Sequence, residues 1–152
     1  MYCPHTATLI NKHGDAYYLT VLRGVMIQDM ERKSVLQPGD YDSSYTKIFI
    51  PFSVDARNAE GEEVTYLPPL AYARNAEPEK HWTLRSDSDE AGRNDFFVKG
   101  LIPSACSLAE ARDLYDGVFI VSTVSTRDYG SAEMQHFEVS SRISERSGIN
   151  YD

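Results

Sequence analysis

Apolar and polar residues alternate with a period of two through much of this 152-residue chain, and this pattern predicts β-strands. The clearest case is residues 46–52, where Ile48 and Ile50 share one face and Phe49 lies on the other. Pro51 has no N–H to donate to a neighbouring strand, so it marks the end of this strand or an edge position.

The first of three predicted hairpins joins residues 6–11 to residues 16–28 through a turn at residues 12–15. Gly24 interrupts the alternation of the second segment. An isolated glycine within a strand pattern indicates a β-bulge or a close approach of two backbones, so we expect an irregularity there.

Two further hairpins are predicted in the second half of the chain. One pairs residues 81–85 with residues 96–100 around a polar, charged and solvated tip at residues 86–95. The other pairs residues 118–124, which are apolar and β-branched, with residues 135–140. In this last segment His136, Glu138 and Ser140 are expected on one face, and Phe137 and Val139 on the other.

One short helix is predicted at residues 107–116. Ser107 and Glu110 have the spacing of a capping box, in which each side chain binds the backbone N–H of the other residue. Gly117 then ends the helix.

Residues 53–80 have few periodic apolar positions and contain Pro68 and Pro78, so we expect a long irregular excursion that is either mobile or functional. The pentapeptide Ala-Arg-Asn-Ala-Glu occurs twice within it, at residues 56–60 and 73–77. Two short copies do not make a solenoid, so we expect no structural consequence.

Together, about seven strands and one helix predict a mainly β fold, a small β-barrel or sandwich with long loops. The length fits a single domain, which we place at residues 1–141, followed by a polar C-terminal tail at residues 142–152.

The composition narrows the classes of function. The chain contains 15 basic and 23 acidic residues and has a net charge of −8, which argues against binding to nucleic-acid phosphates or anionic lipid. No apolar stretch is long enough to span a bilayer, and no targeting segment is visible. Cys3 and Cys106 are expected to be free thiols in a reducing cytoplasm, although a disulfide between them remains open.

The sequence contains no recognisable catalytic, cofactor-binding or metal-binding residues. Glycine-rich phosphate loops and a nucleophile elbow are absent. Asp87, Asp89 and Glu90 lack the spacing of a calcium loop and are expected to be solvated. The four histidines do not have metal-ligand spacing, and His136 beside Glu138 is expected to be a hydrogen-bonded surface residue rather than a catalytic base.

The chain contains ten tyrosines, a residue type that fits two structural roles. Tyrosine is common in β-sheets and is also enriched in protein interfaces. The sequence leaves this choice open for six residues that flank strands and loops: Tyr17, Tyr18, Tyr41, Tyr45, Tyr66 and Tyr72.

As an ordered set, several segments resemble a family of small head–tail (neck) structural proteins of tailed phages and prophages of Gram-positive bacteria. The segments are residues 8–11, 17–29, 48–52, 81–84, 97–100 and 116–141, with the closest likeness at 121–131 and 134–139. The family brings no known site residues, and residues 84–96 depart from it in being longer.

This resemblance implies a structural virion protein, most simply a head-completion or stopper protein between the portal or adaptor and the tail terminator. Such a protein is made in the host cytoplasm and forms a ring of about six or twelve copies. Its acidic wall would let genomic DNA pass without specific binding. The alternatives are a tail terminator or minor tail protein and, in another class, a soluble β-barrel binding module or small enzyme.

Overall fold

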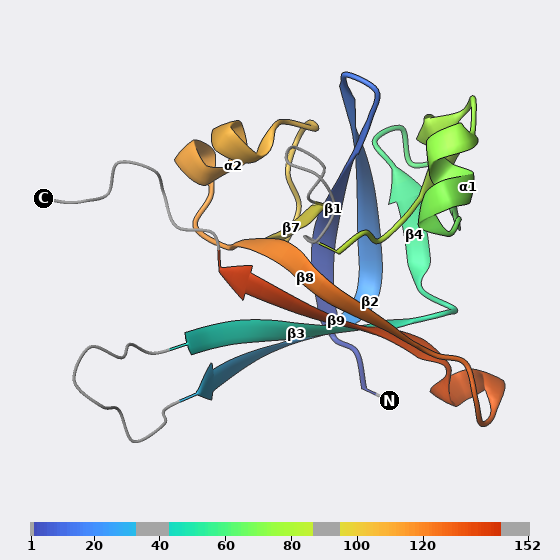
Figure 1. Ribbon diagram of the computed structural model, residues 1–152, viewed down its shortest axis with the longest axis vertical. Coiled ribbons are helices and arrows are strands. Elements are labelled where there is room, and N and C mark those ends of the chain that lie inside the picture. The colour runs from blue at the N-terminus through green and yellow to red at the C-terminus, as the bar shows by residue number, and fades with distance from the viewer. Residues whose placement is uncertain (1, 33–42, 87–94, 144–152) are drawn as a thin grey trace, which may run out of the picture.

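The computed structural model describes residues 2–32, 43–86 and 95–143, and it confirms a mainly β architecture (Figure 1). One sheet of seven strands dominates, and a pair of two-residue strands lies beside it. The seven are β1 (His5–His13), β2 (Ala16–Arg32), β3 (Ser43–Pro51), β4 (Asp55–Asn58), β7 (Phe96–Lys99), β8 (Val118–Arg127) and β9 (His136–Ile143); the short pair is β5 (Thr65–Tyr66) and β6 (His81–Trp82).

Six strands close into a barrel because β1 pairs with both β2 and β7. Around the ring the order is β1, β7, β8, β9, β3 and β2, and all of these pairings are antiparallel. The extra strand β4 pairs with β2. The first and last predicted hairpins are confirmed as β1–β2 and β8–β9.

Strand β2 changes partners along its length. Its first half pairs with β1, and its second half pairs with β3. The predicted irregularity at Gly24 is confirmed: the β1–β2 register shifts beside it, and Gly24 has a φ of +93°, which glycine adopts without steric cost. Strands β3 and β4 both lie along β2, separated by the residues 52–54, which leave the ladder.

Two apolar clusters fill the interior. The larger lies inside the barrel and includes Leu9, Leu22, Ile48, Ile50 and Phe97. Ile48 and Ile50 are fully buried whereas Phe49 is partly exposed, so the predicted faces of this strand are confirmed.

The second cluster packs beneath α2 (Leu108–Leu114), which lies against the barrel end at β7 and β8 (Figure 1). Ser107 Oγ accepts from the Glu110 N–H at 3.2 Å and Glu110 Oε1 accepts from the Ser107 N–H at 3.0 Å, which confirms the capping box. These bonds lower the pKa of Glu110.

The expectation of an irregular segment at residues 53–80 is wrong. It contains β4, β5, the helix α1 (Pro69–Arg74) and a 3₁₀ turn, Pro78–Lys80. Pro69 occupies the first position of α1, where its missing N–H costs nothing, so the prolines begin helical turns here instead of only breaking structure.

The pentapeptide repeat also has a consequence that the sequence reasoning missed. In both copies the asparagine side chain accepts a hydrogen bond from the glutamate N–H two residues later: Asn58 from Glu60 at 3.0 Å, and Asn75 from Glu77 at 2.7 Å. These are Asx-turns, which Asn forms locally in different structural contexts.

The predicted hairpin between residues 81–85 and 96–100 does not form. β6 pairs with β5 in parallel, while both edges of β7 are taken by β1 and β8. Most of the predicted tip, including Asp87, Asp89 and Glu90, lies outside the described residues, as do Tyr41 and residues 144–152 of the predicted tail. The start of that tail is strand instead, because β9 continues to Ile143.

Candidate protein-binding site

An apolar groove of about 700 Å³ opens where the barrel departs from a regular ring. Its walls come from the 52–54 break, from the segment between β4 and α1, and from the β8–β9 hairpin. The residues that line it are Phe52, Val54, Ala56, Val64, Thr65, Tyr66, Pro68, Trp82, Thr126, Asp128 and Phe137. Only one of these residues, Asp128, is formally charged.

Four aromatic rings form the floor and rim of this groove. Phe137 is central: its ring centroid lies 4.6 Å from that of Tyr66, 4.9 Å from Phe52 and 6.0 Å from Trp82. Phe137 and Trp82 are buried, whereas Phe52 is 39% exposed at the rim. The groove therefore presents a preformed aromatic surface to whatever enters it.

β8 forms part of the groove wall, and one edge of this strand is unpaired over its second half. β7 covers only the start of β8, through Val118, Phe119 and Ile120, and within the described chain no strand pairs with that edge at residues 123–127. The opposite edge of β8 pairs with β9 throughout, with a bulge between Val121 and Thr123. Free N–H and C=O groups thus run along one side of the groove.

This edge lacks the features that normally protect free strands. Arg127 is the only charged residue of β8, and the strand contains no proline. In natural proteins, charges, proline or bulges usually protect edge strands from pairing with other chains. β8 has only a bulge, and that bulge lies near the end that β7 covers. Apart from Arg127 at its end, the free part of β8 contains only serine, threonine and valine, and its backbone groups are available to pair with a further strand.

The outer face of the β8–β9 hairpin carries a charge cluster centred on Glu138. Its carboxylate lies 3.4 Å from Lys47 Nζ, 3.2 Å from Arg127 Nε and 3.3 Å from His136 Nε2. Partial burial works against ionisation, but the hydrogen bonds from His136 and Lys47 and the nearby Arg127 lower the pKa of Glu138. His136 also contacts Met134 O at 2.7 Å, consistent with a hydrogen-bonded residue.

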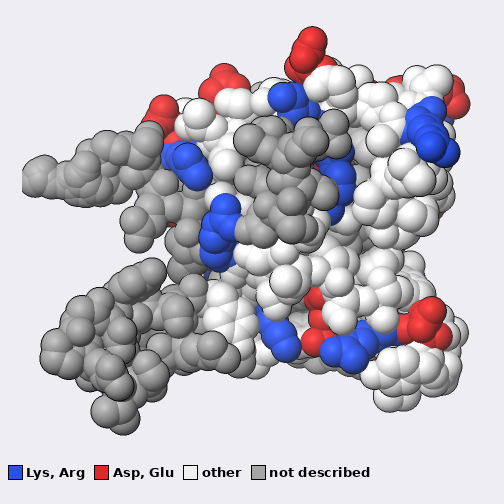
Figure 2. Space-filling view, in the orientation of Figure 1, with Lys and Arg blue, Asp and Glu red and all other residues white. Residues whose placement is uncertain are grey.

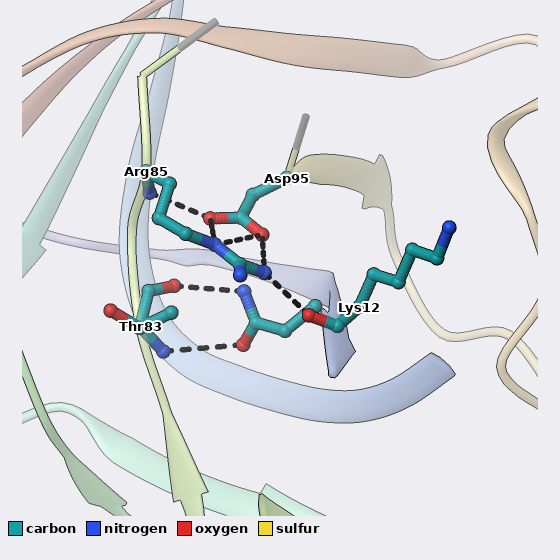
Figure 3. A network of polar contacts seen from close by, with 5 residues as sticks. Lys12, Thr83, Arg85 and Asp95 are labelled. Carbon is teal, nitrogen blue, oxygen red and sulfur yellow. Dashed lines mark hydrogen bonds and ion pairs between the residues drawn. The ribbon is translucent and has the colours of Figure 1, made fainter. Parts of the chain in front are cut away.

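A buried polar network links Asn11 and Lys12 of β1 to Thr83, Arg85 and Asp95 (Figure 3). Asp95 is fully buried and accepts from the Arg85 guanidinium at 2.7 Å and from the Arg85 backbone N–H at 2.6 Å. Arg85 Nη2 also donates to Lys12 O at 2.9 Å. Asn11 binds both the N–H and C=O of Thr83, at 3.2 and 3.0 Å.

Burial raises the pKa of Asp95, and the hydrogen bonds from Arg85, which favour the carboxylate, offset part of that rise. The predicted solvated tip is therefore wrong at this residue. Its neighbour Tyr72 is also fully buried, with the Arg85 guanidinium 5.4 Å from its ring centroid, and burial raises the pKa of Tyr72. This network links α1, the segment after β6 that contains Arg85, and the end of β1.

The structure scatters the remaining candidate residues. His5 Nδ1 accepts from the Ile27 N–H at 3.0 Å, His81 Nδ1 lies 2.8 Å from Thr65 Oγ1, and the His13 ring packs edge-on against Tyr72. Cys3 and Cys106 are free thiols whose pKa values burial raises. Within residues 2–32, 43–86 and 95–143, no group of three potential metal ligands converges.

Five of the six tyrosines whose role the sequence left open lie among the described residues. Tyr72 is a core residue, Tyr66 lines the groove, and Tyr17, Tyr18 and Tyr45 are partly buried within β2 and β3. Exposed apolar side chains also occur at the β8–β9 tip, where Tyr129 is 68% and Met134 is 64% exposed. Apart from Tyr2, which is 78% exposed near the N-terminus, the most exposed aromatic residues of the described chain lie in the groove and at this tip.

Charge is unevenly distributed over the surface. Figure 2 shows acidic side chains along the upper edge of one face, basic side chains below them, and a mixed group of acidic and basic side chains at the lower right. The described helices include none that is long and apolar enough to cross a membrane.

Sequence reasoning missed the groove and the free edge because both depend on strand partners far apart in the chain. One signal was available: the run from Val118 to Thr126 has no charge, which is unusual for a strand that ends with an exposed edge.

Residues 2–142 match the profile of DUF6751, a family of unknown function, and the chain therefore belongs to that family. Searches of curated proteins and of solved structures found no match.

Proposed function

We propose that this member of the DUF6751 family is a structural protein of a tailed-phage virion, a head-completion or stopper protein. It assembles as a ring of about six or twelve copies between the portal or adaptor and the tail terminator. The observation that carries the proposal is the aromatic groove beside the unpaired edge of β8, where Arg127 is the one charged residue. Together they suit a partner that supplies a strand and apolar side chains.

The character of the groove favours a polypeptide over a reacting small molecule. Its walls are largely apolar, and Asp128 is its one charged side chain. Chemistry on a substrate needs a nucleophile or an acid–base pair placed within hydrogen-bond reach, and the groove lining contains no histidine, cysteine or lysine. The groove would therefore recognise a partner by shape and by apolar contact.

The acidic balance of the chain suits a position around a DNA conduit. A net charge of −8 repels phosphates, so that a duplex can pass without adhering to the wall. Lys47 and Arg127 are both engaged by Glu138, which removes two cations from any phosphate-binding patch.

A second function is favoured by the size of the groove. Its volume lies within the range of about 300–1,000 Å³ typical of ligand pockets, so a soluble β-barrel binding module is the alternative from another class. A tail terminator or minor tail protein would use the same surfaces at a different level of the virion.

Cryo-electron microscopy of the assembled particle tests the proposal. We expect this chain as a closed ring at the neck, below the portal. Density at the tail end of the neck, against the tail tube, would favour the terminator. A place in the capsid lattice or at the tail tip, or absence from the particle, would overturn the stopper assignment.

A matched pair of variants tests the groove itself. Phe52→Ser removes an aromatic rim residue that is already 39% exposed, and Leu70→Ser removes an exposed apolar side chain on α1. Complementation of a phage lacking this gene should give tailless heads with Phe52→Ser and complete particles with Leu70→Ser. Equal assembly by both would show that the groove has no role in joining head to tail.

A further inference from the structure

Two free strand edges lie on opposite sides of one four-stranded part of the sheet. This part, which we call the extension, has the order β2, β3, β9, β8 and comprises the second half of β2, all of β3 and β9, and the second half of β8. β1 pairs with β2 only as far as Val25, and no described strand pairs with that edge at residues 28–32.

We propose that the free edge of β8 pairs with the free edge of β2 in a second copy, so that the copies join head to tail. This rests on the proposed function, since it specifies how a ring of copies would close. The two edges are different surfaces, so the contact is heterologous, and repetition of a heterologous contact gives a ring when the rotation closes.

Strand direction supports this pairing. Neighbouring strands of the extension are antiparallel throughout, and its four strands alternate in direction. β8 and β2 therefore run in opposite directions, and placing β2 of the next copy beside β8 continues the same antiparallel pattern. Each junction would form the more stable antiparallel ladder without reversing a strand.

The free segments of β2 and β8 are offset from each other along the strand direction. One cross-strand row runs from Gln28 through Lys47 and Ser140 to Thr123. The free part of β2 extends from this row toward Arg32, and the free part of β8 extends in the other direction, toward Arg127. Full overlap of the two edges shifts neighbouring copies along the strands, and closed sheets require such a shear.

The contact between unlike edges also differs from a contact between like edges in how it grows. Pairing of β8 with β8 of a second copy would yield a closed dimer, which cannot grow into a polar ring.

Cross-linking of purified full-length protein tests the geometry. In a Cys3→Ser, Cys106→Ser background, Gln28→Cys and Ser125→Cys place thiols on the two exposed edges, and Ala109→Cys on α2 is the control. Cross-strand neighbours lie within about 8 Å, so a short thiol-to-thiol cross-linker spans them. Far-UV circular dichroism and thermal unfolding would confirm that each variant is folded.

We expect the Gln28→Cys and Ser125→Cys proteins to give a dimer only when mixed, and the double variant to give a ladder of oligomers. Dimers formed by Ser125→Cys alone, or mixed dimers no more abundant than with Ala109→Cys, would overturn the inference. A neck ring without this link would refute the junction alone, whereas the link in a protein absent from the neck would refute the proposed location.

Discussion

The closed end of the barrel and the extension differ in how they treat polar backbone and side chains. At the closed end β1 and β7 pair on both edges, and Arg85, Asp95 and Asn11 hold one another in a buried network. In the extension two strand edges are unpaired within the described chain, and the charged cluster around Glu138 lies near solvent.

The contrast separates two tasks within one sheet. At the closed end the strand edges are paired and most buried polar groups bond within the chain, except Tyr72 Oη, Thr83 Oγ1 and His13 Nε2, which have no hydrogen-bond partner among the described residues. This pairing stabilises the monomer and leaves few strand edges for a partner. The extension leaves strand edges unpaired and an aromatic groove exposed. These features cost the monomer stability, and that stability is regained when a partner covers them. Substitutions in the two regions should therefore affect different measurements.

The largest effect is expected from Asp95→Ala, which leaves the Arg85 guanidinium buried without its partner. Loss of one member of a buried pair typically costs about 3–5 kcal/mol of unfolding free energy. Urea denaturation followed by tryptophan fluorescence would measure it, with Glu79→Ala, an exposed position, as the control.

A companion variant separates the ion pair from packing. Replacing both residues, Arg85→Met with Asp95→Leu, should recover much of the lost stability, because apolar pairs of similar volume often match buried ion pairs. A double variant as unstable as Asp95→Ala would contradict this account of the network.

Next in size is the effect of Thr123→Lys with Ser125→Lys on self-association. Lysines on an edge strand oppose pairing, and both side chains are exposed in the monomer. We expect at least a ~10-fold weaker association by analytical ultracentrifugation, equivalent to about 1.4 kcal/mol, with unfolding free energy within ~0.5 kcal/mol of the parent. Unchanged association would show that the β8 edge takes no part in self-assembly.

A smaller loss is expected from Ser107→Ala, which removes the side chain that caps α2. N-cap replacements typically cost about 1 kcal/mol, and α2 covers the second core cluster at the closed end. Thermal unfolding should shift downward while cross-linking at the extension is preserved. Loss of cross-linking without loss of stability would mean that the two regions are not separable as described.

The smallest effect concerns acid sensitivity of the extension. The folded pKa of Glu138 is lowered, so its contribution to stability is present above the unfolded pKa of about 4.3 and is lost as pH falls through the folded value. Glu138→Gln should flatten the decline in stability below about pH 4.3. Parallel acid-unfolding curves for the two proteins would show that the cluster contributes nothing there.

Much of the fold followed from the sequence because its signals are local. Alternation located β3 and β9, the Ser107–Glu110 spacing located α2, and Gly24 marked the bulge. The segments that escaped prediction, β4, β5 and α1, are short and gain their structure from pairing with β2, from β6 and from burial of Tyr72.

The candidate site was less predictable, because it is defined by what a strand lacks. Nothing near Thr123 in the sequence says that β7 stops pairing at Ile120. Asp95 illustrates the same difficulty: in a run of polar residues it looks solvated, and only its contact with Arg85 and the packing around it make it a buried partner.

The continuity of β2 has a mechanical consequence. The same strand is bound to β1 in the barrel and to β3 in the extension, so tension applied to the extension along the strands is carried directly into the barrel wall. Ladder hydrogen bonds lie perpendicular to an antiparallel strand, and a pull along the strand loads them all at once instead of one after another. A subunit built this way would resist such a pull until the ladder shears as a unit.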